Sequence, residues 1–250
     1  MDFDIQNHAR ANLLGSELHE RVGRFICRFD PDSDNMYFNY AIPDDDTDPT
    51  ADELDELAAA FVTRDRKPRF EFLPSRSPKL ADVLSAAGYT LHHRGRLMAC
   101  GAGQVLDPPV PDGLSILDAA DEDAFYAAAS VQHPAFDDEI PTREVATRTA
   151  TRLMARGGRL AVAVTGDGLT VGAGQTSAPI EGIVEIGGIA TAPEYRRRGI
   201  ASAVTAYLTR TLHESGVRTV WLDPADAGAG RAYGKAGFQV VGEIFHMVRE

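Results

Sequence analysis

The sequence has 250 residues, of which 44% are hydrophobic and 25% are charged. These proportions are typical of a globular protein and exclude a disordered chain. No apolar run is long enough to cross a membrane and no secretory leader is recognisable, so we expect a cytoplasmic protein without a membrane partner. The formal net charge of −12 argues against nucleic acid as a partner, because phosphate contacts need a basic surface. The only two cysteines, Cys27 and Cys100, are too few for a disulfide framework, and no metal site is expected.

The first part of the chain alternates between helical and strand patterns. Leu13, Leu14, Leu18 and Val22 have the spacing of an amphipathic helix over residues 9–23. Aromatic and β-branched residues predict strands over 25–29 and 36–42, and apolar spacing predicts a helix over 52–61. Four aspartates between Pro43 and Pro49 predict a solvated loop.

One order of elements occurs twice: a strand, a helix, a glycine followed by an aromatic residue, and a strand. The first copy has Gly88-Tyr89, with elements predicted over 69–73, 78–87 and 90–99. The second copy has Gly237-Phe238, with elements predicted over 219–222, 225–236 and 239–248. This order favours an internal repeat, in which the N-terminal unit is a degenerate copy of the C-terminal fold. Chance similarity between two common β-α-β segments is the alternative.

The strongest break in the pattern is Asp107-Pro108-Pro109-Val110-Pro111-Asp112-Gly113. Three prolines and a glycine stop both helix and sheet. We therefore predict an N-terminal α/β unit over 1–106, a linker over 107–113 and a second domain over 114–250.

The second domain begins with a predicted strand at 114–117. Helices are expected over 121–130 and 142–156, and a hairpin over 160–164 and 169–173. The next predicted strand, 183–189, leads to Arg196, Arg197, Arg198 and Gly199, and then to a helix. Unpaired N–H groups and the dipole at a helix N-terminus favour an anion, and the arginines add to this effect. This stretch therefore predicts a pyrophosphate site, although the chain contains neither a P-loop nor a complete Gly-x-Gly-x-x-Gly fingerprint.

Two motifs in this half resemble those of the GCN5-related N-acetyltransferase (GNAT) superfamily. The first is Arg196-x-x-Gly199-x-Ala201. The second is Asp226-x-x-Ala229-x-x-Ala232-Tyr233-x-x-x-Gly237-Phe238, in which Asp226 and Ala232 replace the usual Asn and Leu. The resemblance covers 114–248 and implies an α/β (α+β) fold, a mixed central sheet flanked by helices. It also implies that two diverging parallel strands receive the pantetheine arm of a coenzyme.

The resemblance further implies acetyl-CoA as the acyl donor and a set of residues that bind it. The implied cofactor-binding residues are Ile189, Ala190, Thr191, Arg196, Arg197, Arg198, Gly199, Ile200, Ala201, Ser202 and Asp226. The change from Asn leaves the contact of Asp226 with pantetheine in doubt. Tyr233 is the implied acid that protonates the departing thiolate, and a buried structural tyrosine is the alternative.

The expected activity is transfer of an acetyl group to a primary amine of a small molecule or peptide by direct attack. Because an alkyl ammonium is protonated at neutral pH, this reaction needs a base. Glu185 is the first candidate, on the side of its strand that Gly187 and Ile189 share by alternation. The reserve candidates are Glu181, Asp223, Asp226 and His133. The alternative function is a module that binds acyl-CoA without turnover.

Overall fold

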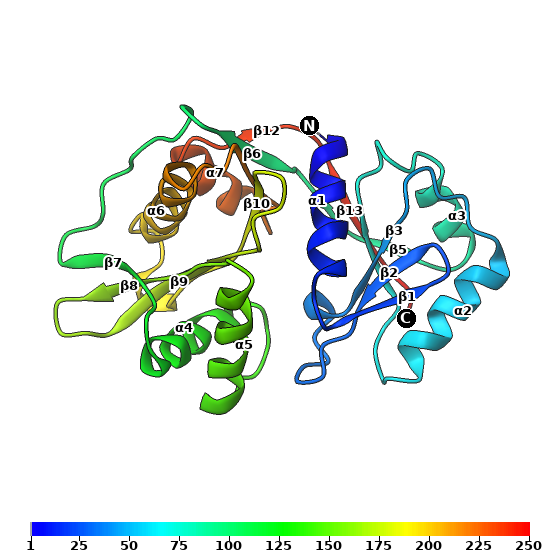
Figure 1. The fold of residues 1–250 in the computed structure, drawn as a ribbon, viewed down its shortest axis with the longest axis horizontal. Helices are drawn as coiled ribbons and strands as arrows, with labels where there is room; N and C mark the ends of the chain where they lie inside the picture. Colours follow the sequence, from blue (N-terminus) through cyan, green and yellow to red (C-terminus); the bar gives the residue numbers. More distant parts are fainter. Residues whose placement is uncertain (1) are drawn as a thin grey trace. The chain divides into compact units, whose positions relative to one another are not determined.

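The structure is a computed structural model that describes residues 2–250. It divides into two compact units: one comprises the chain up to Leu97 together with Val241–Glu250, and the other is Met98–Val240 (Figure 1). The elements of the first unit are α1 Asp2–Leu14, β1 His19–Val22, β2 Phe25–Arg28, the 3₁₀ turn η1 Met36–Phe38, β3 Tyr40–Pro43, α2 Ala51–Val62, β4 Arg69–Phe72, α3 Leu80–Ala86, β5 Thr90–Gly95 and β13 Ile244–Val248. Those of the second are β6 Met98–Gly101, β7 Leu114–Asp118, α4 Glu122–Ala135, α5 Arg143–Ala155, β8 Leu160–Thr165, β9 Thr170–Thr176, β10 Ile183–Thr191, the 3₁₀ turn η2 Pro193–Tyr195, α6 Ile200–Glu214, β11 Thr219–Leu222, α7 Ala227–Lys235 and β12 Gln239–Val240.

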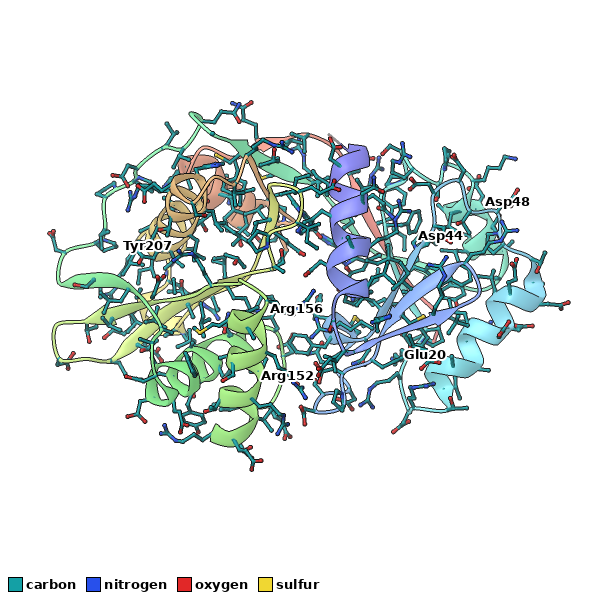
Figure 2. All side chains as sticks on the ribbon, viewed as in Figure 1. Glu20, Asp44, Asp48, Arg152, Arg156 and Tyr207 are labelled. Atoms are coloured by element: carbon teal, nitrogen blue, oxygen red, sulfur yellow. The ribbon has the colours of Figure 1, made fainter. Side chains whose placement is uncertain are left out.

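The first unit is built on a six-stranded sheet of order β1-β2-β3-β4-β13-β5. Only β3 and β4 are parallel, joined by α2 as a crossover. Buried side chains of α2 and α3, such as Leu57 and Leu84, pack with Phe70 of β4. Leu13 of α1 packs with Ile42 of β3 in a separate cluster, and Figure 1 shows α1 on the other side of the sheet from α2 and α3. The acidic loop before α2, where Figure 2 labels Asp44 and Asp48, contains no helix or strand, as predicted.

The second unit is built on a seven-stranded sheet of order β7-β8-β9-β10-β11-β6-β12. Only β10 and β11 are parallel, with α6 as their crossover. The face of α6 that carries Ile200, Val204 and Leu208 is buried against the sheet, as its helical spacing predicts. Helices α4 and α5 cover the opposite face (Figure 1). Both units combine a mixed sheet with flanking helices, which confirms the predicted α/β fold class.

The chain passes from one unit to the other between β5 and β6, and passes back between β12 and β13. Strand β6 follows β5 in the chain but pairs with β11 and β12, and β13 follows β12 but pairs with β4 and β5. The continuous strands predicted over 90–99 and 239–248 are therefore wrong, since each is two strands in different sheets. The compact units also differ in their bounds from the predicted domains 1–106 and 114–250. Residues 107–113 contain no helix or strand, as predicted, but they connect β6 and β7 of the same unit.

Two further local predictions need correction. The helix expected over 9–23 ends at Leu14, and His19–Val22 forms a strand instead because it pairs antiparallel with β2. The strand expected over 36–42 begins with a 3₁₀ turn, since the side chain of Asn35 accepts a hydrogen bond from the Tyr37 N–H and caps that turn. In both cases a hydrogen-bonded partner outweighs the local propensity.

Within residues 2–250, the helices are too short or too polar to cross a membrane.

Candidate active site

The basic loop ends at the exposed N-terminus of α6. Gly199 caps the helix with φ +93° and ψ 0°, a left-handed conformation that glycine adopts at little cost. No side chain caps this end, and the first helical hydrogen bond runs from the Ala203 N–H to the Gly199 carbonyl. The N–H groups of Ile200, Ala201 and Ser202 therefore lack partners within the helix and mark its positive end.

Three exposed arginines precede this helix start. Arg196 Nε donates to the Thr191 carbonyl at 3.2 Å, and Arg198 Nη2 donates to the Glu194 carbonyl at 3.0 Å. The Arg198 guanidinium also lies 5.0 Å from the centre of the Tyr195 ring. These contacts hold two cations beside the open helix end. Their positive charge and the free N–H groups together form an arrangement that suits a phosphate or pyrophosphate.

Strands β10 and β11 separate just before this loop. They pair only from Ile183 with Thr219 to Glu185 with Trp221, whereas β10 continues to Thr191. The Ala192 N–H donates to β9, at the Val171 carbonyl. Because N–H groups alternate along a strand, the Thr191 N–H faces the side that β11 leaves open. The divergence expected from the resemblance is present, and it exposes strand backbone to a ligand.

A bulge interrupts β10 within the diverging segment. Gly187 pairs with Gln175 and Ala190 with Ala173, so that Gly188 and Ile189 together oppose Gly174. This extra residue reverses the alternation of side chains. Ile189 consequently packs with the core that α6 covers, where Ile186 also lies. The prediction that Glu185 shares a side with Ile189 is therefore wrong.

Two glycines of β9 let α6 approach the sheet. A Cβ atom on Gly172 would lie 2.6 Å from Ile200 Cγ2, and one on Gly174 would lie 3.0 Å from Val204 Cγ1 and 2.3 Å from Ile189 Cδ1. Any side chain at these positions would push the first turns of α6 away from β9. The sequence analysis did not select this pair, because its role in placing the helix start depends on contacts with a distant segment of the chain.

Helix α7 carries Tyr233, which is 8% exposed and belongs to the core of the second unit. Burial raises the pKa of its hydroxyl to about 12, and the carboxylates of Asp226 and Asp223 contribute in the same direction. The hydroxyl therefore stays protonated across the neutral range, as a proton donor must. Asp226 is the N-cap of this helix, and its Oδ1 accepts from the Ala229 N–H at 2.7 Å. Asn and Asp are both good N-caps, so the departure from the family motif preserves this local function.

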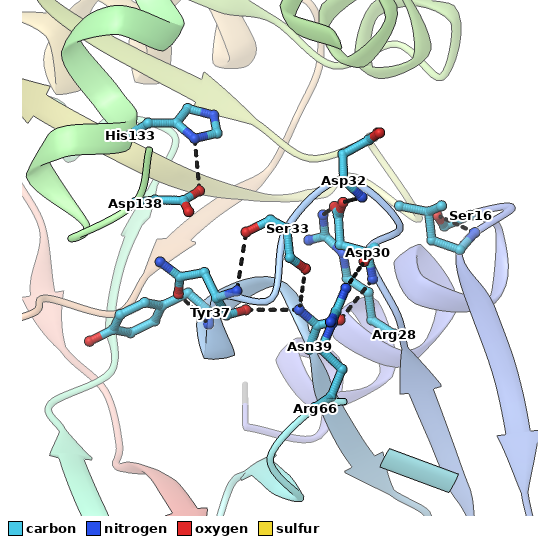
Figure 3. Close-up of polar contacts among 12 residues, drawn as sticks. Ser16, Arg28, Asp30, Asp32, Ser33, Tyr37, Asn39, Arg66, His133 and Asp138 are labelled. Atoms are coloured by element: carbon cyan, nitrogen blue, oxygen red, sulfur yellow. Dashed lines mark hydrogen bonds and ion pairs between the residues drawn. The ribbon is translucent and has the colours of Figure 1, made fainter. Parts of the chain in front are cut away.

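The reserve candidates for the base lie in different places. His133, in the last turn of α4, has its Nδ1 atom 2.8 Å from Asp138 Oδ2 (Figure 3). Asp223 follows the last residue of β11 and lies close enough to Tyr233 to affect its pKa. Glu181 precedes β10, at the end of that strand farther from the arginines. Glu185 lies within β10, and its backbone N–H donates to Ser177 Oγ at 2.9 Å.

Helix α4 also contacts the bulge, through a residue that sequence reasoning did not select. Gln132 Nε2 donates to the Gly188 carbonyl at 2.8 Å. Nothing local marks Gln132, because its partner is 56 positions away. Over the part of the chain that the structure describes, no group of three or more His, Cys, Asp or Glu side chains is arranged to hold a metal ion.

The chain was compared with known families and structures. Residues 122–238 match the acetyltransferase (GNAT) family, whereas no curated protein matches the chain. A GCN5-related N-acetyltransferase from Kribbella flavida is 24% identical, with a TM-score of 0.81 over 100% of this chain and 95% of that one. A tandem GNAT protein from the clavulanic acid biosynthesis pathway is 17% identical, with a TM-score of 0.60 over 90% of this chain and 78% of that one. These likenesses show a shared fold, and they extend over both units.

Proposed function

We propose that the chain, whose residues 122–238 match the GNAT acetyltransferase family, transfers an acetyl group from acetyl-CoA to a primary amine of a small molecule or peptide. The observation that carries this proposal is the open, basic N-terminus of α6 beside the gap between β10 and β11. This arrangement suits an anionic group next to an extended arm, which is how pyrophosphate and pantetheine follow each other in acyl-CoA.

In this proposal the pyrophosphate binds to the segment from Arg196 to Ser202. The N–H groups of the first turn of α6 donate to it, and the arginines neutralise its charge. The pantetheine arm continues along the open edge of β10, where the backbone of Ile189, Ala190 and Thr191 provides hydrogen bonds. Asp226 contributes by fixing the start of α7 through its cap.

The reaction is a direct attack of the amine nitrogen on the thioester carbonyl. A C–N bond forms, and the C–S bond then breaks with its electron pair on sulfur. The Tyr233 hydroxyl donates its proton to that sulfur, and the base takes the proton that the amine loses. The amine must be deprotonated before it attacks, since its ammonium form has a pKa of about 10.4 in water.

Glu185 is the proposed base, and His133 is the second candidate. His133 is supported by its contact with Asp138, because a carboxylate on one ring nitrogen holds the ring in a fixed orientation. The variants Glu185→Gln and His133→Gln distinguish them. The base variant loses turnover most at low pH, where the substrate is more fully protonated.

The alternative function is a module that binds acyl-CoA without turnover. Two measurements separate it from the enzyme: release of free thiol from acetyl-CoA with a panel of primary amines, and thermal stabilisation by acetyl-CoA alone. We expect thiol release that depends on one class of amine. Stabilisation without thiol release for any amine would favour the binding module. The cytoplasmic location stays a prediction from the sequence.

A further inference from the structure

The side chain of Gln132 is buried at the C-terminal end of α4, with 9% of the residue exposed. In the contact with the Gly188 carbonyl, the side chain of Gln132 must be the hydrogen-bond donor, because a carbonyl oxygen can only accept. Only the amide nitrogen of glutamine can donate. Gln132 Nε2 therefore donates to the Gly188 carbonyl at 2.8 Å. In a buried setting, such a hydrogen bond is costly to leave unmade.

Gly188 is adapted to this contact in two ways. Its φ of +61° lies in the left-handed region, which favours glycine. A Cβ atom there would also lie 2.5 Å from Gln132 Nε2 and 3.4 Å from Gln175 Cγ. Glycine at 188 therefore satisfies both the backbone conformation and the close approach of the amide.

The bulge has a hydrogen-bond partner from outside the sheet. A bulge leaves its extra residue outside the regular ladder of hydrogen bonds and bends the strand. Here the amide of Gln132, supplied by a helix, engages the backbone within that irregular segment. The segment directly precedes Ala190 and Thr191, whose backbone borders the gap left by β11.

We propose that Gln132 is a positioning residue for acyl transfer, and this inference rests on the proposed function. By holding the Gly188 carbonyl, its amide fixes the bulge and thus the direction of the N–H groups that follow it. Those N–H groups are then preorganised to receive the thioester carbonyl and the pantetheine arm. Without the amide, the bulge can shift along β10 and move these donors, while the rest of the sheet stays paired.

The test compares two substitutions of Gln132 with one of another glutamine. Gln132→Leu removes the donor at similar volume, and a displacement of about 1 Å at the acyl group is expected to lower kcat by roughly 10- to 100-fold. Gln132→Glu places a carboxylate against the carbonyl at neutral pH, but its protonated form can donate again. Because burial raises the pKa of a carboxyl, the ratio of variant to wild-type kcat should rise as the pH falls towards 5. Gln104→Glu is the matched control, since Gln104 Oε1 accepts from the Gly101 N–H at 2.7 Å and a carboxylate can do the same.

A purely structural role predicts a different result. Gln132→Leu would then lower the unfolding temperature but leave kcat and KM of the folded protein at wild-type values, and Gln132→Glu would show no recovery at low pH. That result would overturn the positioning role. If Gln132→Leu does not fold, the pH dependence of kcat in Gln132→Glu by itself decides between a positioning and a purely structural role.

Failure of the proposed function would be visible separately, as wild-type protein that releases no thiol with any amine. The positioning role is then decided by calorimetric titration with acetyl-CoA and by amide exchange at residues 188–191. Weaker binding and faster exchange in Gln132→Leu, but not in Gln104→Glu, support it. Equal affinity and equal exchange in both variants refute it.

Discussion

Each unit contains one parallel β-α-β crossover, and the loops that lead into the two crossover helices have opposite charge. The loop between β10 and α6 carries Arg196, Arg197 and Arg198. The loop between β3 and α2 carries a cluster of aspartates, two of which are labelled in Figure 2. The same topology therefore places basic side chains before the crossover helix of one unit and acidic side chains before that of the other.

The N-termini of the two crossover helices, α2 and α6, also differ in how they are capped. Thr50 caps α2 in a capping box: Oγ1 accepts from the Glu53 N–H at 3.3 Å, and the Glu53 carboxylate accepts from the Thr50 N–H at 2.8 Å. The start of α6 has Gly199 and no side-chain cap. Helix α2 thus satisfies its own N–H groups, whereas α6 leaves them available to a ligand.

Helices α3 and α7 can be compared at the residue five positions before the aromatic residue that follows each of them. Gly88-Tyr89 after α3 and Gly237-Phe238 after α7 end their helices alike, because the Tyr89 N–H bonds to the Leu84 carbonyl and the Phe238 N–H to that of Tyr233. In this alignment the buried Leu84 takes the place of Tyr233. The comparison shows that a shared fold needs only an apolar residue there, and that the hydroxyl belongs to the second unit alone.

The first prediction removes that hydroxyl. Tyr233→Phe preserves the packing of the ring, so acetyl-CoA affinity should change little while kcat falls by roughly 10²- to 10⁴-fold. Because the pKa of Tyr233 is about 12, its ionisation should not limit turnover below about pH 11. Single-turnover thiol release is the measurement, since slow product release would mask the chemical step.

Tyr207→Phe is the control for this variant. The Tyr207 hydroxyl interacts with Asp118 on β7, and we expect its loss to cost about 1 kcal/mol of stability with turnover intact. Should Tyr233→Phe behave like Tyr207→Phe, then Tyr233 has the same packing role as Leu84, and the distinction between the two units disappears at this position.

The second prediction places an anion at one end or the other of α6. Gly199 and Gly216 flank this helix with φ of +93° and +95°, and a Cβ atom on either meets nothing within 4 Å. Glu at either position should therefore cost similar stability, about 1–2 kcal/mol of backbone strain. Only Gly199→Glu should weaken acetyl-CoA binding, by roughly 100-fold or more, because its carboxylate competes for the N–H groups. Calorimetric titration measures both, and equal affinity in the two variants would remove the pyrophosphate from this helix end.

The third prediction concerns the acidic loop. Burial disfavours the charge of Asp45, but hydrogen bonds from Arg10 and Arg76 outweigh it and lower the pKa of this carboxyl. A carboxyl with a lower pKa in the folded than in the unfolded protein stabilises the fold at pH values above its unfolded pKa. That stability is lost as the pH falls through its folded pKa. Asp45→Asn should thus cost about 1 kcal/mol at pH 7 and progressively less below about pH 4. Thermal unfolding between pH 7 and 3 tests this, and a constant difference between variant and wild type would contradict it.

The smallest effect is expected in α7, which contains Gly228, Gly230 and Gly234 where α3 contains no glycine. A Cβ atom on Gly234 meets nothing within 4 Å, so Gly234→Ala should stabilise the protein by about 0.5–1 kcal/mol. At Gly228 a Cβ atom would lie 3.0 Å from the capping oxygen of Asp226, so Gly228→Ala should gain less. Equal gains in urea unfolding would show that the cap yields to the new methyl group.

The sequence predicted well those parts whose signals are local. The hairpin of β8 and β9, strand β10 and the start of α6 at Ile200 follow from apolar spacing and from glycines within a few residues. The same holds for the repeated order of strand, helix and glycine-aromatic pair. In each case a residue and its hydrogen-bonding or packing partner lie within about one turn of each other.

The bounds of the units could not be predicted in this way. Residues 90–99 and 239–248 are each apolar enough to form one long strand, and only pairing decides where each breaks. Strand β6 joins a sheet whose other members come later in the chain, and β13 joins one completed about 150 residues earlier. Backbone hydrogen bonds at such separations leave no periodic trace in the sequence.

The sequence by itself determined the chemistry available to this protein: the arginines, the glycine at the helix start and the tyrosine of α7 are identities that folding cannot change. The tertiary structure decided how that chemistry is oriented. The extra residue at Gly188 turns Ile189 away from the side of Glu185. Gln132, 56 positions away in the sequence, donates a hydrogen bond to the Gly188 carbonyl. Side-chain direction in a strand depends on register, and register is set by whichever partners lie alongside, not by the strand's own residues.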